Sequence, residues 1–285
     1  MPFPDTLVLG ATGRLGRLLQ YSWNQPAIAA RLLWQGRALS GLGQADHRAV
    51  LAPLKDPEKL TQAAMGRQIL CLAGGVPGRG DLDDNWRLAA AALRATEPGG
   101  RVILCSSAAV YGNQPGQLDE ATVLCPANDY GRAKLEMEQR SAALAADIGV
   151  QLCVLRIGNI AGLDAILGGW RPGFQLDQFG DGATPARSYI GVRTLAQVLG
   201  VLLTLPQLPG VVNLAQPGLI EMGALLDAAG LDWTARPAPG NAISRVLLDT
   251  RLLQDLVQLP EAGAADMVLQ WSKLEPHMTE NQEQV

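Results

Sequence analysis

Tyr130 and Lys134 stand four residues apart in the chain. On a helix this spacing places both side chains on one face, one turn apart. An ammonium group beside a phenol favours the phenolate, so we expect the pKa of Tyr130 to fall from its usual value of about 10. Such a pair can exchange a proton with a substrate oxygen, and a Ser hydroxyl of the segment 106–112 upstream could hold that oxygen. This chemistry would interconvert a carbonyl and an alcohol.

The residues before the pair favour a helix that begins just ahead of Tyr130. Asn128 and Asp129 are good N-cap residues, which places Tyr130 in the first helical turn. The positive end of the helix dipole would then favour the phenolate as well. The spacing alone also fits a pair on an exposed helix surface that has no catalytic role.

A glycine-rich turn follows the first predicted strand. Residues 6–9 form a short apolar run, and a helical pattern begins after the turn. A strand, a glycine turn and a helix together present free backbone N–H groups to a phosphate at the helix N-terminus. The glycine spacing, Gly-x-x-Gly-x-x-Gly, departs from the standard dinucleotide fingerprint. The turn residues expected to contact a ligand are Gly10, Thr12, Gly13, Arg14, Leu15 and Gly16.

Strand-like and helical segments alternate along most of the chain, which predicts an α/β fold with a parallel sheet covered by helices on both faces. Ligands of such sheets bind at the carboxyl ends of the strands, where Gly74, Ser107 and Gly158 should converge. Further strands are expected near 31–34, 68–72, 101–105, 150–155 and 210–214. Helices are expected over 82–96, 130–146, 194–205, 222–229 and 244–256.

Several of these motifs, in this order, resemble the extended short-chain dehydrogenase/reductase family, which includes the NAD-dependent epimerases and dehydratases. The resemblance rests on the glycine turn, on Tyr130 with Lys134, and on the segments 106–112, 155–162 and 187–192. It implies that Ser107 polarises the substrate oxygen and that Tyr130 is the general acid/base. It further implies that Lys134 binds the nicotinamide ribose and that hydride passes to or from the cofactor.

The resemblance also implies a Rossmann-type doubly wound parallel sheet with a small C-terminal substrate lobe. The cofactor-binding domain would comprise residues 1–157 plus about 187–215, and the lobe about 158–186 and 216–285. Besides the glycine turn, the implied cofactor contacts are Gly36, Arg37, Leu72, Ala73, Gly74, Tyr130, Lys134, Ile157, Gly158 and Ile160.

The end of the second predicted strand bears on the choice of cofactor. NAD-binding domains usually place an Asp or Glu there for the ribose 2′-OH, whereas this chain has Gly36 and Arg37. Arg37 and Arg14 could instead bind a 2′-phosphate, which favours NADP(H) over NAD. A surface Arg37 without this role is the alternative, so NAD also stays open.

The substrate is less well defined by the sequence. Asn159 and Arg187 match positions that contact a diphosphate in nucleotide-sugar enzymes of the family, although either residue could equally be structural. Gly191 replaces the His of the family motif, and the lobe is short for a nucleotide-sugar epimerase. Asn85 matches an Asn that is more often structural or cofactor-side than catalytic. We expect a small-molecule carbonyl or secondary alcohol, with a sugar or sugar nucleotide among the candidates.

Composition excludes several other classes. The net charge is −4 without a basic run, which argues against nucleic acid as a partner. No apolar stretch reaches about 18 residues, so we expect no membrane span and a cytoplasmic location. The cysteines and histidines lack metal-ligand spacing, and we expect no metal site. The alanine-rich helices at 82–96 and 130–146 either pack closely on the sheet or form a homodimer interface.

We therefore expect an NAD(P)-dependent oxidoreductase or epimerase. Ala108 and Ala109 follow Ser107, where dehydratases of the family often carry an acidic pair, so dehydration is the least favoured reaction. The alternative is a non-catalytic NAD(P)-sensing or regulatory protein with the same fold. Such proteins often lack the Tyr or the Lys, and both are present here.

Overall fold

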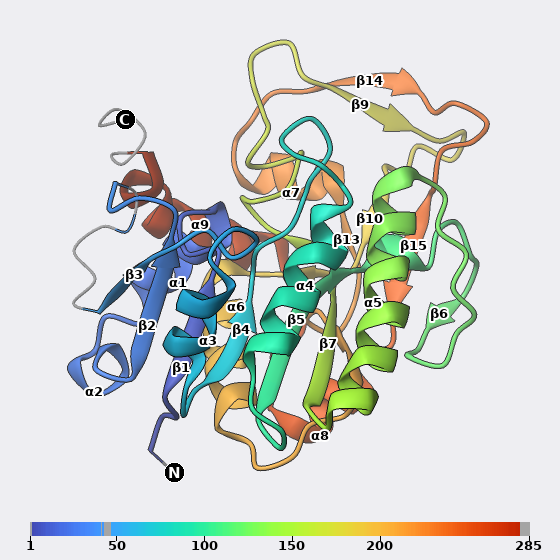
Figure 1. Ribbon diagram of the computed structural model, residues 1–285. Coiled ribbons are helices and arrows are strands. Elements are labelled where there is room, and N and C mark those ends of the chain that lie inside the picture. The colour runs from blue at the N-terminus through green and yellow to red at the C-terminus, as the bar shows by residue number, and fades with distance from the viewer. Residues whose placement is uncertain (1, 41, 43–46, 280–285) are drawn as a thin grey trace.

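A seven-stranded parallel sheet forms the centre of the protein (Figure 1). The structure is a computed structural model that describes residues 2–40, 42 and 47–279. The strand order is β12-β7-β5-β4-β1-β2-β3, in which the direction of strand addition reverses between β1 and β4. The strands are β1 (Thr6–Leu9), β2 (Leu32–Gly36), β3 (Arg48–Val50), β4 (Gln68–Cys71), β5 (Arg101–Ser107), β7 (Gln151–Ile157) and β12 (Val211–Leu214).

Helices cover both faces of this sheet because its strands are apolar on both sides. Leu7 and Leu9 of β1 pack in one core cluster with α3, α4 and α5, whereas Val8 packs in the other with α1, α6 and α8. In Figure 1 α4 and α5 lie in front of β5 and β7. The helices are α1 (Arg14–Ser22), α2 (Pro26–Ala29), α3 (Pro57–Ala64), α4 (Asp84–Ala95), α5 (Asp129–Ile148), α6 (Val192–Thr204), α7 (Met222–Ala228), α8 (Arg251–Leu256) and α9 (Ala264–Thr279).

Three smaller sheets accompany the main sheet. In Figure 1 β9 and β14 lie above the main sheet, and β6 lies beside α5. One has the order β13-β10-β15-β6, the second pairs β11 with β8, and the third pairs β14 with β9. A single 3-10 turn, Ala108–Val110, follows β5. The short strands are β6 (Gln117–Leu118), β8 (Asn159–Ile160), β9 (Gln175–Gln178), β10 (Ala186–Arg187), β11 (Tyr189–Ile190), β13 (Ile220–Glu221), β14 (Thr234–Pro237) and β15 (Arg245–Leu248).

These elements confirm the predicted α/β class, and the strand expected near 210–214 does join the main sheet, beside β7. One predicted helix is wrong in its first half. The segment expected as a helix over 244–256 begins with β15, and only Arg251–Leu256 is helical. The strand forms because its backbone pairs with β10 on one side and with β6 on the other.

The last helix, α9, packs against α1, α6 and α7. Its Gln270 side chain caps α6, because Oε1 accepts from the backbone N–H groups of Arg193 at 3.0 Å and Thr194 at 3.1 Å. Gly191 directly before α6 makes this possible, since a Cβ there would collide with the Gln270 amide. The departure from the family His at position 191 therefore makes room for a cap from α9. Among the described residues, no helix combines the length and the apolar character that crossing a membrane requires.

Candidate active site

A cleft of about 370 Å³ opens where β1, β4, β5 and β7 end. These strands are neighbours in the parallel sheet, so the residues that follow them meet at one edge. Most of the site residues expected from the sequence line this cleft. They are Gly10, Gly13, Arg14, Leu15, Gly16, Leu72, Gly74, Ser107, Tyr130, Lys134, Ile157, Gly158 and Ile160.

The other expected residues do not line the cleft. They are Thr12, Gly36, Arg37, Ala73, Asn159 and Arg187. Ala73 is nevertheless adjacent to the glycine turn, because a Cβ on Gly10 would lie 2.8 Å from the Ala73 nitrogen. The lining also includes Val76 and Arg79, from the loop after β4, which the sequence reasoning missed.

In the glycine turn the backbone passes so close to neighbouring backbone segments that side chains would not fit. Gly10 has a φ of +82°, a conformation that favours glycine, and its N–H donates to the Gln35 side chain at 2.9 Å. A Cβ on Gly16 would collide with the Ala11 carbonyl group. The first turn of α1 has neither a side-chain cap nor an acidic residue. Its N-terminus therefore presents backbone N–H groups and the positive end of the helix dipole to an anion in the cleft.

Tyr130 is positioned by the start of α5, as expected. Asn128 is the N-cap, and its Oδ1 accepts from the Gly131 N–H at 2.8 Å. Gly131 allows the helix to approach the turn after β5, because a Cβ there would lie 2.5 Å from the Ala109 carbonyl oxygen. This close approach brings Tyr130 next to Ser107, and both side chains line the cleft.

Lys134 lies one turn further along α5 and is only 6% exposed. Its Nζ donates to the Cys105 carbonyl oxygen at 2.8 Å and lies 5.8 Å from the centroid of the Tyr130 ring. The three residues with an expected catalytic role therefore converge in the cleft.

The electrostatics of the pair differ from the expectation. Burial raises the pKa of Tyr130, and the nearby Ser107 hydroxyl opposes this rise only in part. Burial also lowers the pKa of Lys134. The predicted lowering of the Tyr130 pKa by Lys134 is thus not present here, because both groups lose solvent and the ammonium is directed at the Cys105 carbonyl oxygen.

A buried polar network lies directly beneath the site. Glu138, one turn after Lys134, accepts from Arg156 of β7, with Nη2 to Oε2 at 2.8 Å and Nε to Oε2 at 3.0 Å. The Ser106 hydroxyl also donates to Glu138. Arg156 Nη1 in turn donates to the Tyr111 hydroxyl at 3.0 Å. The network ties α5 to β5 and β7, and the sequence reasoning missed it although Glu138 continues the spacing of four from Lys134.

Asn85 of α4 holds the loop after β4 in place. Its Nδ2 donates to the Gly75 oxygen at 3.0 Å and to the Leu82 oxygen at 2.9 Å. Its Oδ1 is buried without a partner in the described part of the chain. Gly74 permits this arrangement, since a Cβ there would collide with Oδ1 and lie 3.4 Å from the Lys134 Nζ. An acceptor without a partner beside the cleft fits a polar ligand group bound nearby.

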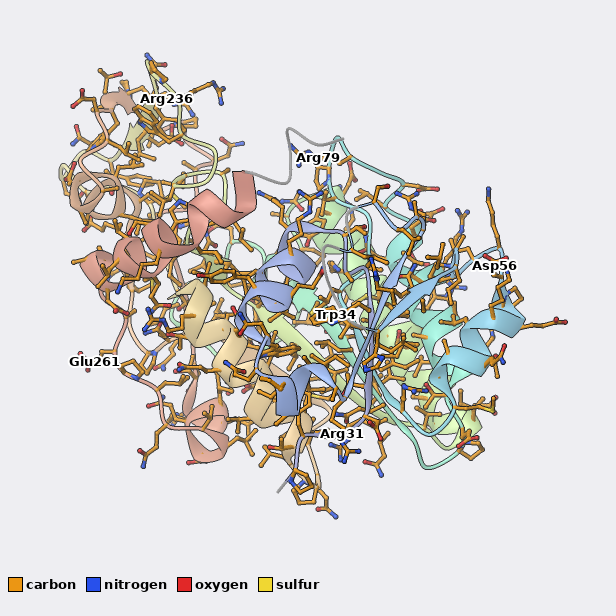
Figure 2. All side chains as sticks on the ribbon, turned by 90° about the vertical axis from the view of Figure 1, so that its left-hand side faces the viewer. Arg31, Trp34, Asp56, Arg79, Arg236 and Glu261 are labelled. Atoms are coloured by element: carbon orange, nitrogen blue, oxygen red, sulfur yellow. The ribbon has the colours of Figure 1, made fainter. Side chains whose placement is uncertain are left out.

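Two arginines reach the cleft from opposite sides of the glycine turn. Arg14 begins α1, and Arg79 comes from the glycine-rich loop after β4. Figure 2 shows Arg79 at the upper end of the molecule, where the strands end, and Arg31, directly before β2, at the lower end. Within the described residues neither Arg14 nor Arg79 has an acidic partner. The cleft thus combines a helix N-terminus with two free cations, which fits a ligand that carries phosphate groups.

The two expected substrate residues use their polar atoms within the protein. Arg187 donates to the carbonyl oxygens of Ala186 and Ile243, both at 2.8 Å. Asn159 pairs with Tyr189 across β8 and β11, and its backbone N–H donates to the Ser188 carbonyl oxygen at 2.9 Å. These contacts correspond to the structural alternative considered for each residue.

Crowding at the end of β2 explains why position 36 carries a glycine and not an acidic residue. A Cβ on Gly36 would lie 2.9 Å from Leu42 Cγ and 3.1 Å from the Ala38 oxygen. Leu42 is fully buried, so it cannot move aside without loss of core packing. An aspartate at position 36 is therefore incompatible with this arrangement of the loop.

The sequence of the chain matches a known protein family. The model of the NAD dependent epimerase/dehydratase family matches residues 6–167, which is more than half of the chain. The chain belongs to this family. The match includes the glycine turn, Ser107, Tyr130 and Lys134, so the cleft lies in the part of the chain that the family shares. A search of curated proteins finds no match.

Solved structures share the fold of this epimerase/dehydratase family member over nearly its whole length. UDP-glucose 4-epimerase from Brucella ovis, in complex with NAD, superposes with a TM-score of 0.78 at 18% identity, covering 96% of this chain and 98% of its own. UDP-glucose-4-epimerase from Stenotrophomonas maltophila, with bound NAD and formylated UDP-arabinopyranose, gives 0.77 at 20%, covering 97% and 99%.

A short-chain dehydrogenase/reductase superfamily protein from Agrobacterium tumefaciens with bound NAD gives a TM-score of 0.74 at 18% identity and covers 98% of this chain and 99% of its own. At these identities the likeness shows the fold alone, a Rossmann-type sheet. The class of NAD-dependent epimerases and dehydratases rests on the family match.

Proposed function

We propose that the chain is an NAD(P)-dependent oxidoreductase or epimerase that acts on a carbonyl or a secondary alcohol. The observation that carries this proposal is the adjacent pair of Ser107 and Tyr130, with Lys134 beside it, in a cleft that also holds the glycine turn. A sensing protein without turnover needs the glycine turn but does not need this pair.

In the proposed reaction Tyr130 donates a proton to the substrate oxygen during reduction and removes it during oxidation. Ser107 donates a hydrogen bond to the same oxygen and orients it towards Tyr130. Lys134 would hold the cofactor ribose from its buried position beside Tyr130. The bound nicotinamide supplies or accepts the hydride. Sugars and sugar nucleotides are included in the substrate class.

We further propose that residues 1–157 with about 187–215 bind the cofactor, and that about 158–186 and 216–285 form the substrate lobe. The main sheet supports the first part of this division, because its strands lie within those ranges. In the second part, α9 contacts α1 and α6 as well as α7, so it would connect the two units.

Replacement of Tyr130 tests the catalytic role. The Tyr130→Phe variant should bind NADPH or NADH as the parent does, while turnover on a panel of carbonyl compounds and UDP-sugars falls by about 10²–10⁴-fold. Tyr21→Phe, on an exposed tyrosine away from the cleft, is the control and should keep full turnover. Unchanged turnover in Tyr130→Phe would refute the role. A parent protein that binds cofactor but turns over no member of the panel would favour the sensing alternative.

For the cofactor we propose NADP(H), with Arg14 and Arg37 at the 2′-phosphate. The exclusion of an acid at position 36 by Leu42 supports this choice. Titration with NADPH and NADH, followed by nicotinamide fluorescence, should give tighter binding of NADPH. Arg37→Ala should weaken NADPH by about tenfold and leave NADH unchanged, and Arg94→Ala on the exposed side of α4 should affect neither. Equal affinities in the parent would reassign the cofactor to NAD.

A further inference from the structure

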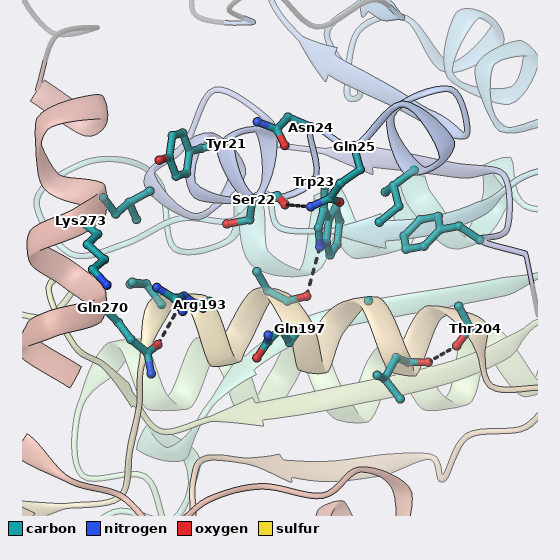
Figure 3. A pocket seen from close by; sticks show the side chains of 17 residues that line it. Tyr21, Ser22, Trp23, Asn24, Gln25, Arg193, Gln197, Thr204, Gln270 and Lys273 are labelled. Carbon is teal, nitrogen blue, oxygen red and sulfur yellow. Dashed lines mark hydrogen bonds between the residues drawn. The ribbon is translucent and has the colours of Figure 1, made fainter. Parts of the chain in front are cut away.

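A second and larger cavity lies on the other side of the sheet from α4 and α5. It is a groove of about 710 Å³ between the end of α1, the outer face of α6 and the side of α9 (Figure 3). This volume falls within the range of small-molecule sites in proteins. None of the residues that line the groove also lines the candidate active site.

The floor of the groove is apolar. Val192 and Ala196 of α6 and Leu274 of α9 are at most 4% exposed, and the Trp23 indole covers the wall formed by α1. The Trp23 Nε1–H donates to the Ala196 carbonyl oxygen at 3.1 Å, which fixes the ring against α6. The hollow thus has rigid walls and would bury the apolar body of a ligand.

Gly200 keeps the middle of the groove open. A Cβ at this position would have Trp23 Nε1 as its nearest neighbour at 3.7 Å and Phe3 Cε2 at 3.9 Å, which is ordinary contact distance. A larger side chain at position 200 would therefore have room for its Cβ, and its outer atoms would extend into the groove. The space exists because α6 carries a glycine there, although glycine weakens a helix interior.

One end of the groove is positively charged. Arg193 and Lys273 line it from α6 and α9, and Figure 3 shows both side chains reaching the region beside Gln270. Within the described part of the chain, neither forms an ion pair with a carboxylate. Asp266, which accepts from Gln270 Nε2 at 2.7 Å, does not line the groove, and no other Asp or Glu does.

The position of Arg193 makes the excess of positive charge at this end of the groove less favourable still. It lies in the first turn of α6, where the helix dipole disfavours a cation, and that turn contains no acidic residue. The backbone N–H groups of Arg193 and Thr194 are already bound by Gln270. The two side-chain cations at this end of the groove would each gain a charged partner from a carboxylate bound there, which would also offset the unfavourable helix dipole at Arg193.

We propose that this groove binds a small amphipathic carboxylate. The apolar body would lie along Trp23, Ala196 and Gly200, and the carboxylate would lie between Arg193 and Lys273. This second site is separate from the cofactor cleft, and the proposal does not depend on the reaction catalysed there.

The test is calorimetric titration of the full chain with 2-naphthylacetate, with its neutral amide as a probe of charge. The carboxylate should bind with a Kd below about 1 mM, and the amide should bind about tenfold more weakly. Arg193→Gln with Lys273→Gln should weaken the carboxylate by about tenfold, whereas Arg94→Gln should leave it unchanged. Gly200→Leu should abolish binding of both probes by filling the groove, and thermal unfolding should show that each variant is folded.

The cofactor cleft is the competing location for an anionic probe. Arg14→Gln with Arg79→Gln removes the two arginines of that cleft and should leave binding of 2-naphthylacetate unchanged. Loss of binding in this variant, with normal binding in Arg193→Gln/Lys273→Gln, would overturn the proposal. Absence of binding by the parent at about 1 mM, or normal binding by a folded Gly200→Leu variant, would overturn it as well.

Discussion

Tyr130 and Lys134 lie in surroundings that penalise charge on either side chain. Burial raises the pKa of the phenol and lowers that of the ammonium, so each group favours its neutral form more than it would in water. The spacing of the two residues in the sequence predicts that they share a helix face, and the structure places both on the face of α5 that lines the cleft. It did not predict the direction of the Tyr130 pKa, because that depends on burial and on the Cys105 carbonyl group, which belong to the tertiary structure.

This leads to a prediction for the protein without cofactor. A phenol whose pKa is raised stays neutral at pH values where an ordinary tyrosine begins to ionise at about 10. The phenolate absorbance of the parent and of Tyr130→Phe should therefore coincide from neutral pH up to about pH 10. A phenolate that appears in the parent near neutral pH and is missing in Tyr130→Phe would contradict the prediction and would favour control by Lys134.

At the scale of the elements, α5 is the part of the fold on which the site depends most. It carries Tyr130 and Lys134 towards the cleft, and through Glu138 it is bound to β5 and β7. Local signals in the sequence sufficed to place this helix, since Asn128 caps it as predicted. They did not suffice for β15, because the pairing of Arg245–Leu248 with β10 and β6 joins segments far apart in the chain. The partners of Arg156 were missed for the same reason.

The buried pair of Glu138 and Arg156 should dominate the stability of this region. Both side chains are 6% exposed, so removal of one charge leaves the other buried without compensation. Glu138→Gln should lower the free energy of unfolding by about 3–5 kcal/mol, measured by urea denaturation.

The same helix provides a matched control. Glu136 pairs with Arg140 at 2.7 Å on the exposed surface, and Glu136→Gln should change the unfolding free energy by less than about 1 kcal/mol. A double variant, Glu138→Gln with Arg156→Met, should recover part of the loss, since it removes the unpaired charge. Equal effects of Glu136→Gln and Glu138→Gln would show that the buried pair contributes no more than the exposed one.

At the scale of the whole molecule, the fold class and the location of the cleft followed from the alternation of strands and helices. The topology of the main sheet brings the ends of β1, β4, β5 and β7 together, as a parallel sheet requires. The groove beside α6 had no counterpart in the sequence, because its walls come from α1, α6 and α9, which have no shared motif.

The outer faces of α4 and α5 remain a proposed homodimer interface. Three alanines of α5, at positions 142, 143 and 146, are exposed. Their methyl groups form no hydrogen bonds with water, so a flat row of them suits contact with a second copy better than contact with solvent. We expect the protein to sediment as a dimer and Ala143→Arg to shift it to a monomer, while Ala235→Arg on β14 leaves the dimer intact. Sedimentation of the parent as a monomer would contradict the interface.

The cap that Gln270 provides for α6 bears on the order of events during synthesis. Gln270 follows the start of α6 by more than 70 residues, and it supplies the acceptor for two N–H groups there. Until Gln270 has been synthesised and has left the ribosome, the start of α6 lacks this acceptor. We infer that the start of α6 matures only after translation has passed α9, and that a ribosome stalled shortly before Gln270 would display a chain still sensitive to proteases around residue 191.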